Sequence, residues 1–182
     1  MSIIKQVAKN SLIYGLGDLL TKLVGFLLIP LYTHYLTTAE YGVLELLDLT
    51  SYIVGFLLAM GIAQAVMRFY FEYESEEERN RVVSVALLTV WLASAGGLVV
   101  LQVCAPWFSE AVFQSADYGP HFRILFATLA VTISNEIPLQ YLRIRQLAVR
   151  FISISLCRVS LSLSLNILFI VFYGLGVQGI LL

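Results

Sequence analysis

The feature that most constrains this chain is a long apolar stretch with two opposite charges in its middle. Residues 10–42 read NSLIYGLGDLLTKLVGFLLIPLYTHYLTTAEYG. About 25 mostly apolar residues, at about 1.5 Å rise each, are enough to cross a hydrocarbon core of about 30 Å. A charge inside that core costs at least about 2.5–3.5 kcal/mol unless it is paired or hydrated. Asp18 and Lys22 are four residues apart, so they share one helical face and can pair.

The same helix is predicted to have one face of small and polar residues, while Leu, Val and Phe cover the rest. At about 100° per residue, this stripe consists of Ser11, Gly15, Asp18, Lys22, Gly25 and Ile29. We therefore expect the stripe to face other helices or a cavity, and the apolar sides to face lipid. This arrangement is typical of a helix in a transporter with several spans, and not of a simple anchor.

Composition places the whole chain in a bilayer. The hydrophobic fraction is 59%, the charged fraction 13% and the mean hydropathy +0.87, whereas soluble domains are about 45–50% apolar and about 25% charged. A net charge of −1 without a basic stripe argues against a nucleic-acid partner.

Five apolar runs and the beginning of a sixth predict an all-α, polytopic transmembrane bundle that forms a single domain over residues 1–182. The expected spans cover residues 11–36, 41–68, 82–105, 121–142 and 151–173, with a sixth beginning near residue 176. Serines alternate with apolar residues in the fifth run, as in a strand of a membrane barrel. The other runs are continuous, and one alternating segment cannot close a barrel, so we expect a helix there too.

The distribution of basic residues predicts a cytoplasmic N-terminus. The connecting loops on the other side, at 36–40, 105–120 and 174–178, contain no Lys or Arg. The eight basic residues on the first side are Lys5, Lys9, Arg68, Arg79, Arg81, Arg143, Arg145 and Arg150. Such an excess marks the cytoplasmic side.

Six charged residues inside the expected spans are candidates for a polar cavity: Asp18, Lys22, Glu45, Asp48, Glu136 and Arg158. Counted from the span ends at about 1.5 Å per residue, Asp18, Glu136 and Arg158 fall about 8–12 Å from the cytoplasmic face, and Lys22 and Asp48 about 17–18 Å. Opposite charges on different helices would thus share a layer, as a pathway through the protein needs. The alternative is that they form buried ion pairs that only fix helix register.

Motifs for an enzymatic reaction are missing from the sequence. It contains no P-loop, G-x-S-x-G or H-E-x-x-H pattern, so ATP hydrolysis on this chain cannot drive transport. The two histidines, His34 and His121, have no cluster of Cys, His or acidic residues around them in the sequence. We therefore expect no metal, no cofactor and no enzymatic activity.

The residues of the first stretch also resemble a known family. The features that carry the resemblance are Gly15, Lys22, Gly25-Phe26, Pro30, Tyr32-Thr33, Leu36 and Tyr41-Gly42, followed by Gly61, Ala65, Leu142-Arg143 and the closing GVQGILL. They are similar to bacterial polysaccharide-biosynthesis membrane proteins, the O-antigen type oligosaccharide flippases of the multidrug/oligosaccharidyl-lipid/polysaccharide exporter superfamily. His34 stands where the family pattern has an arginine or lysine.

The resemblance implies a transporter that flips an oligosaccharide linked to undecaprenyl diphosphate across the bacterial inner membrane, for polysaccharide or lipopolysaccharide assembly. It also implies two lobes with about 12–14 spans, of which this chain would be the N-terminal lobe, and polysaccharide polymerase or assembly proteins as partners. Lys22 and Arg158 would meet the diphosphate, and Asp18, Asp48 and Glu136 would balance their charge or bind a coupling cation. Two alternatives stay open: a cation-coupled multidrug or organic-cation antiporter of the same superfamily, and a membrane scaffold without transport.

Overall fold

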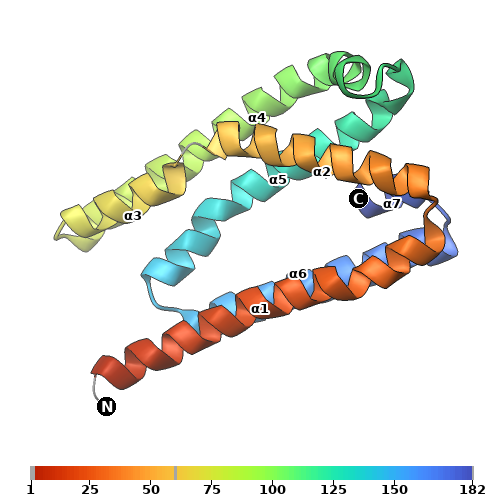
Figure 1. Cartoon of the computed structure of the whole chain (residues 1–182). Helices are drawn as coiled ribbons and strands as arrows, with labels where there is room; N and C mark the ends of the chain where they lie inside the picture. The colour runs from red at the N-terminus through yellow and green to blue at the C-terminus, as the bar shows by residue number, and fades with distance from the viewer. Residues whose placement is uncertain (1–2, 60, 182) are drawn as a thin grey trace. The chain divides into compact units, whose positions relative to one another are not determined.

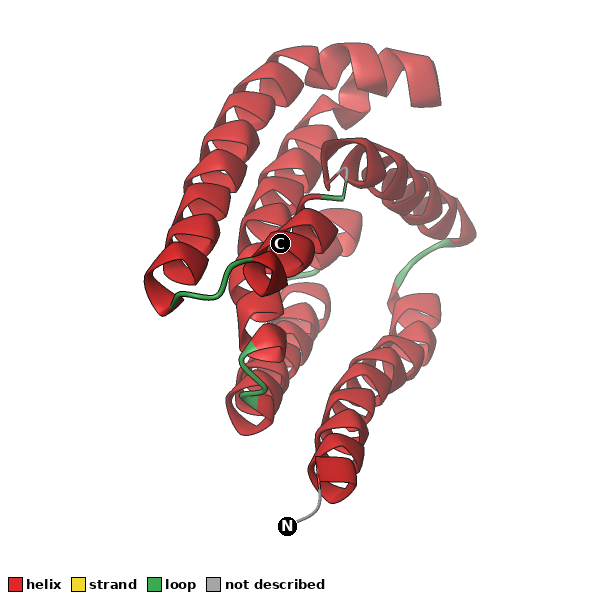
Figure 2. Cartoon of the chain, turned by 90° about the vertical axis from the view of Figure 1, so that its left-hand side faces the viewer, coloured by secondary structure: helices red, strands yellow, loops and turns green. Residues whose placement is uncertain are grey.

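The computed structural model describes the backbone of residues 3–59 and 61–181; the side chains of residues 3–11, 13, 16, 18, 20, 21, 59 and 63 lie outside the description. Within these residues every regular element is a helix and no strand occurs (Figure 2), which confirms the all-α class. The elements follow one another as α1 (Ile3–Tyr35), α2 (Thr38–Ala59), α3 (Ile62–Glu72), α4 (Glu76–Phe113), η1 (Ala116–Tyr118), α5 (Gly119–Ile144), α6 (Ala148–Ile167), the π-helical turn η2 (Leu168–Phe172) and α7 (Gly176–Leu181) (Figure 1).

Four stretches of the described chain are long and apolar enough to cross a membrane: Thr38–Leu58, Glu76–Phe113, Ala116–Ile144 and Ala148–Phe172. They contain the expected spans at 82–105 and 121–142, all but the last residue of the one at 151–173, and the first part of the one at 41–68. The first expected span lies within α1, where many side chains of the first half are outside the described residues. The chain is therefore a membrane-embedded helical protein with several spans.

The chain divides into two compact units. Unit 1 comprises residues 1–41 and 141–180, and unit 2 comprises residues 42–140 and 181–182. Unit 1 combines helices that are far apart in the sequence, and unit 2 contains helices joined by tight turns. The two units are described one after the other.

Unit 1 is built on the contact between α1 and α6. Tyr14 packs edge-on against Phe151, with ring centroids 5.2 Å apart, and farther along Tyr32 donates a hydrogen bond of 2.8 Å from its hydroxyl group to Oδ1 of Asn166. Because higher residue numbers on α1 meet higher numbers on α6, the two helices are parallel. This direction agrees with their expected positions as the first and fifth spans of one bundle.

Gly17 lets the two helices of this pair approach closely. It is buried, and a Cβ atom built on it would lie 3.6 Å from the ring of Phe151 and 3.9 Å from Ile152. Close helix contact through small residues is a common way for membrane helices to associate, since dispersion contacts replace the missing hydrophobic effect.

Unit 2 contains the hairpin of α3 and α4 and the antiparallel pair of α4 and α5. Trp91 and Gln102 on α4 donate hydrogen bonds to the carbonyl oxygens of Ser134 and Arg123 on α5, at 3.4 and 2.9 Å. At the far end of this pair, Phe108 of α4 packs against Phe122 and Phe126 of α5. Phe122 and Phe126 are fully buried, so this aromatic cluster is the core of the unit.

Side-chain caps explain where two of the helices begin. The Thr37 hydroxyl accepts from the backbone N–H of Glu40, and the Glu40 carboxylate accepts from the backbone N–H of Thr37 at 2.8 Å. This pair is a capping box, in which Ser or Thr is followed three residues later by Glu. Ser75 caps α4 by accepting from the backbone N–H of Glu78, but here the Glu78 carboxylate accepts from the Ser75 hydroxyl and not from its backbone N–H.

The continuous helix expected over 41–68 is interrupted, which corrects that part of the sequence prediction. α2 ends at Ala59, and α3 begins at Ile62. Gly61 between them has a φ of 72°, in the left-handed region that glycine enters without steric cost. Glycine therefore permits the break at this position, inside an otherwise apolar run.

The expected loop over 105–120 is also mostly helical. α4 continues through Pro106 to Phe113, and only Gln114 and Ser115 separate it from η1. The Ser109 hydroxyl is fully buried and donates to the carbonyl oxygen of Ser115, which ties the turn to the helix. With 38 residues, α4 is about 57 Å long at about 1.5 Å per residue, so it is longer than a hydrocarbon core of about 30 Å is thick.

Candidate functional site

Lys22 and Arg158, the two cations expected to meet an anionic substrate, lie on the two packed helices of unit 1. Their relative position along the helix axes follows from the register of α1 and α6. Tyr32 bonds to Asn166, which is 134 residues later, and Gly17 faces Phe151 and Ile152, which are 134 and 135 residues later. The same offset places Lys22 level with residues 156–157 of α6. Arg158 is one or two residues farther on, or about 1.5–3 Å along the axis.

This register corrects the depths derived from span ends, which placed Lys22 roughly 5–10 Å farther into the membrane than Arg158. Residue 17 of α1, and not residue 11, is level with the start of the fifth expected span at Phe151. Helix α1 thus has several more residues on the N-terminal side of this level than the sequence prediction assumed. Lys22 and Arg158 share one layer, and both side chains are exposed in the structure.

The stripe of small and polar residues on α1 is not the face that packs against α6. The face toward α6 carries Tyr14, Gly17 and Tyr32, whereas a Cβ atom on Gly15 or Gly25 would have no atom within 4 Å. The stripe, which includes Lys22, is therefore an open surface of unit 1. The side chain of Asp18, the other charge of this stripe, lies outside the described residues, so its pairing with Lys22 stays a prediction.

The remaining candidate residues are three acids of unit 2. Glu45 and Asp48 are on α2, three residues apart and so one helical turn from each other, and Glu136 is on α5. All three side chains are exposed. The structure thus places the two cations at one level of the α1–α6 pair and the three acids on two helices of unit 2. One cavity that contains all of them stays a prediction.

Asn166 of α6 is a buried polar residue that joins α6 to α1. By helical spacing it shares a face with Ser155, Arg158 and Ser162, and in the structure it accepts a hydrogen bond from Tyr32 and donates one to the carbonyl oxygen of Ser162. Tyr32 belongs to the residues that carry the family resemblance. Both polar residues, Tyr32 and Asn166, could be identified within apolar spans from the sequence. Only the structure shows that they bond to each other.

We expect Tyr32→Phe to lower the stability of unit 1 by about 0.6–1.7 kcal/mol, the range found for hydrogen bonds between membrane helices. The variant keeps the ring but removes the hydroxyl group that bonds to Asn166. Thermal unfolding of the purified protein in detergent measures the effect. Tyr35→Phe, which removes the hydroxyl group of an exposed tyrosine three residues away, is the matched control and should unfold at the unchanged temperature.

A second cluster at the start of α6 joins aromatic and cationic side chains. The Arg143 guanidinium lies 4.7 Å from the centre of the Phe151 ring, and this ring also makes the T-shaped contact with the Tyr14 ring. The Tyr14 hydroxyl is buried and has no hydrogen-bond partner among the described residues. Arg143 is one of the basic residues that predict the cytoplasmic side and lies in the last turn of α5, so a cation–π contact anchors this end of α5 to the α1–α6 pair.

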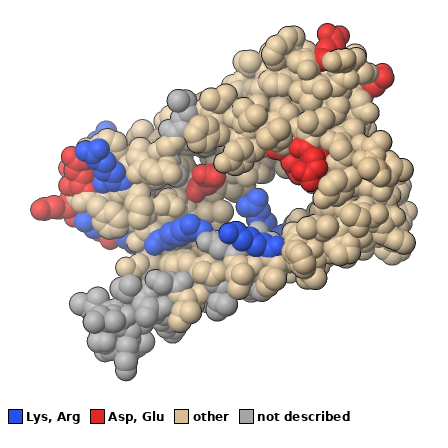
Figure 3. Space-filling view, viewed as in Figure 1, with Lys and Arg blue, Asp and Glu red and all other residues tan. Residues whose placement is uncertain are grey.

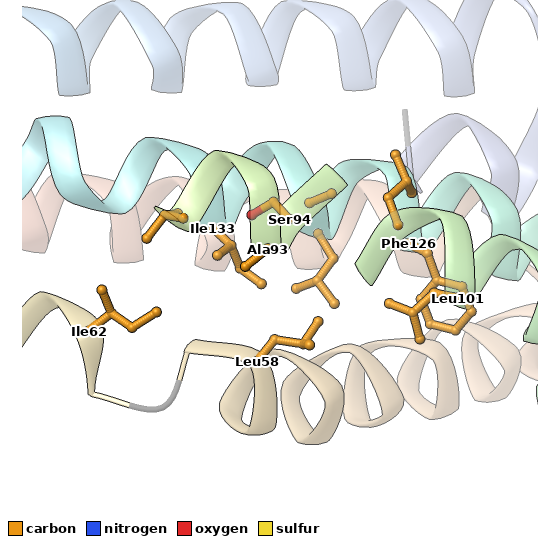
Figure 4. A pocket seen from close by; sticks show the side chains of 11 residues that line it. Leu58, Ile62, Ala93, Ser94, Leu101, Phe126 and Ile133 are labelled. Atoms are coloured by element: carbon orange, nitrogen blue, oxygen red, sulfur yellow. The ribbon is translucent and has the colours of Figure 1, made fainter. Parts of the chain in front are cut away.

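Unit 2 encloses a small cavity between the end of α2, the start of α3, α4 and α5 (Figure 4). Its volume is about 30 Å³, enough for one water molecule. The lining is apolar, among it Leu58, Ile62 and Phe126, except for Ser94, whose hydroxyl is buried without a partner in the described part of the chain. It is too small for a sugar or a lipid, so it is a feature of packing beside the break at Gly61.

No group of three or more His, Cys, Asp or Glu residues within the described chain could hold a metal ion. Charged atoms of both signs gather at the turn between α3 and α4, and uncharged atoms cover most of the rest of the visible surface of unit 2 (Figure 3). Few charged residues therefore lie within the apolar helices. Among the described side chains of α1 and α6, the charged ones are all cationic.

Comparison with known proteins identifies the family. A family model described as polysaccharide biosynthesis protein matches residues 7–182. A search among curated proteins and a search among solved structures each give no match. The match covers nearly the whole chain, including α1, α6 and every candidate residue, and it agrees with the membrane-spanning helices described above. The chain belongs to the polysaccharide biosynthesis protein family and is one of its membrane-embedded members.

Proposed function

We propose that this protein acts in transport and catalyses no chemical reaction: it moves an oligosaccharide linked to undecaprenyl diphosphate from the cytoplasmic to the outer leaflet of the bacterial inner membrane. Such movement would supply lipid-linked units for O-antigen or lipopolysaccharide assembly. The family match over residues 7–182 supports the link to polysaccharide assembly. The substrate has a long apolar carrier, a diphosphate group and a polar sugar, so a path for it needs cations within an apolar surface.

The observation that carries the proposal is the position of Lys22 and Arg158 at one level of the α1–α6 pair. Each cation within a span costs at least about 2.5–3.5 kcal/mol, and two together also repel each other. An arrangement of this kind is stable when anions meet it, and a diphosphate offers several anionic oxygens at once. The carboxylates of Glu45, Asp48 and Glu136 would balance these charges or bind a coupling cation when no substrate is present.

The acids of α2 favour a second candidate function. Glu45 and Asp48 are exposed one turn apart on an apolar helix, an arrangement that also suits an antiporter for organic cations. Such a protein would depend on these acids and would tolerate the loss of Lys22.

Complementation of a strain without its own flippase tests the proposal. Expressed from its complete gene, the protein should restore surface polysaccharide and should remove the lipid-linked oligosaccharide that accumulates in the inner membrane. If the oligosaccharide still accumulates while the cells become resistant to organic cations, the protein is an antiporter and the flippase proposal fails.

The proposed orientation predicts that position 116 is outside the cell and position 77 is inside. Ala116 and Glu77 are exposed and their side chains make no helix cap, so cysteines at these sites should leave the fold unchanged. They are introduced one at a time after Cys104 and Cys157 are replaced by alanine. We expect a membrane-impermeant maleimide to label position 116 in intact cells, and position 77 only after the cells are opened. The reverse labelling would place the N-terminus outside.

A further inference from the structure

The hairpin of α3 and α4 holds a groove that no part of the transport proposal uses. Its volume is about 540 Å³, within the range of about 300–1,000 Å³ typical of small-molecule sites. Residues of both helices line it, and all of them belong to unit 2. We propose that this groove binds a phospholipid of the cytoplasmic leaflet that has a phosphoethanolamine head group.

The walls and the floor of the groove suit an acyl chain. Val66 and Ala86 are buried or half-buried at its floor, while the side chains of Phe69 and Val85 are 47% and 56% exposed along its walls. Hydrophobic side chains with this exposure leave apolar area uncovered, and in a bilayer an alkyl chain can pack against this area through dispersion contacts. Apolar lining thus favours the tail of a lipid over a soluble ligand.

The depth of the groove matches one leaflet of a membrane. On α4 it extends from Glu78 at the charged end to Thr89, eleven residues or about 16 Å. Half of a hydrocarbon core is about 15 Å thick. An acyl chain that lies in the groove would therefore have its head group at the level of the α3–α4 turn.

Side chains of both charge signs lie at the end of the groove near the α3–α4 turn, and they determine which lipid head group fits there. Glu78 and Arg81 are exposed, both line the groove, and they are three residues apart on one face of α4. The Glu78 carboxylate accepts a hydrogen bond from Ser75 and has further acceptor sites for an ammonium group. The Arg81 guanidinium is suited to a phosphate. A head group with one phosphate and one primary ammonium complements this pair, whereas an anionic head group would meet Glu78.

The neighbouring arginine has another role. Arg79 donates from its Nε atom to the carbonyl oxygen of Tyr73 at 2.8 Å, and its guanidinium lies 5.5 Å from the centre of the Tyr70 ring. These contacts hold the turn of the hairpin and fix the charged end of the groove. Arg81, which does not share these contacts, is the residue placed to meet the lipid phosphate.

Native mass spectrometry of the purified full-length protein, with defined phospholipids added, tests this inference. We expect one phosphatidylethanolamine molecule to stay bound, at least tenfold more tightly than phosphatidylglycerol or phosphatidylcholine. Glu78→Gln and Arg81→Gln should each weaken this binding at least tenfold. The glutamine side chain can also accept the hydrogen bond from the Ser75 hydroxyl, so Glu78→Gln keeps the start of α4 intact. Free phosphoethanolamine should not displace the lipid, because the acyl chain contributes to binding.

Two further variants make the test specific to the groove. Arg68→Gln removes the same charge from α3 outside the groove lining and should bind the lipid normally. Ala86→Trp fills the floor and should abolish binding, with thermal unfolding in detergent as the check that the protein is folded. The inference is overturned if no phosphatidylethanolamine is retained, if phosphatidylglycerol binds as tightly, or if Arg68→Gln weakens binding as much as Arg81→Gln. Because none of these measurements involves transport, their outcome is independent of the proposed flippase activity.

Discussion

Replacement of Lys22 by alanine is expected to reduce surface polysaccharide to the level of a strain that has no flippase, while the protein still inserts and folds. A hydrogen bond between charged groups contributes about 1.5–3 kcal/mol, and a factor of ten corresponds to about 1.4 kcal/mol. Loss of one such contact with the diphosphate therefore lowers the transport rate about tenfold to more than a hundredfold. Lys22→Arg keeps the charge with a different geometry and should retain part of the activity. Surface polysaccharide and membrane levels of the protein are measured together, in cells that express the complete gene.

A double variant separates a substrate contact from a structural ion pair. If Lys22 only neutralised Asp18, then Asp18→Asn with Lys22→Gln would remove both charges at little cost, since replacing a buried ion pair is often nearly neutral for stability. If Lys22 meets the diphosphate, the double variant folds but does not transport. Normal transport by this variant would make Lys22 structural and would contradict the proposed site. Arg150→Gln, which removes an exposed cation from the first turn of α6, is the control and should transport normally.

Gly17→Leu is expected to separate α1 from α6 and to lower stability by about 1–3 kcal/mol, the usual cost of overpacking. A single Cβ atom fits at this position, at 3.6 Å from the Phe151 ring, so Gly17→Ala should unfold at nearly the unchanged temperature. The three further carbon atoms of leucine have no space between the helices. Thermal unfolding in detergent measures both variants.

Gly15 provides the matched control for this series, because it lies two residues away on the same helix and faces open space. Gly15→Leu should leave the unfolding temperature unchanged. If it lowers that temperature as much as Gly17→Leu does, then the face of α1 toward α6 is wrongly assigned. If Gly15→Leu is stable but fails in transport, the open stripe next to Lys22 belongs to the substrate path.

The sequence predicted the helical class and most helix positions because these depend on local chemistry. Apolar runs of sufficient length mark the spans. The starts of α2 at Thr38 and of α4 at Glu76 come before the expected starts at residues 41 and 82, because the caps at Thr37 and Ser75 lie in polar segments outside the apolar runs. The break at Gly61 and the continuation of α4 through Pro106 were missed for a common reason. Neither glycine nor proline fixes an outcome inside a membrane helix, since neighbouring helices determine whether the backbone stays helical.

The candidate residues could be predicted from the sequence because a charge inside a membrane span costs free energy, so charges are rare within apolar runs and stand out. Their positions along the helix axes could not be predicted in the same way. The depth of Lys22 relative to Arg158 depends on the register between α1 and α6. This register is determined by the close contact at Gly17 and by the hydrogen bond between Tyr32 and Asn166. Such contacts join residues 134 positions apart, and one sequence alone has no signal that pairs them.

The parallel contact of α1 and α6 also has a consequence for synthesis of the protein. Ribosomes add about 5–20 residues per second, so about 7–27 s pass between the synthesis of Tyr32 and that of Asn166, its partner 134 residues later. During this interval α1 has already left the ribosome without the helix that covers Gly17 and Tyr32. Nascent α1 must therefore be held by the insertion machinery, or exchange temporary neighbours in the bilayer, until α6 arrives.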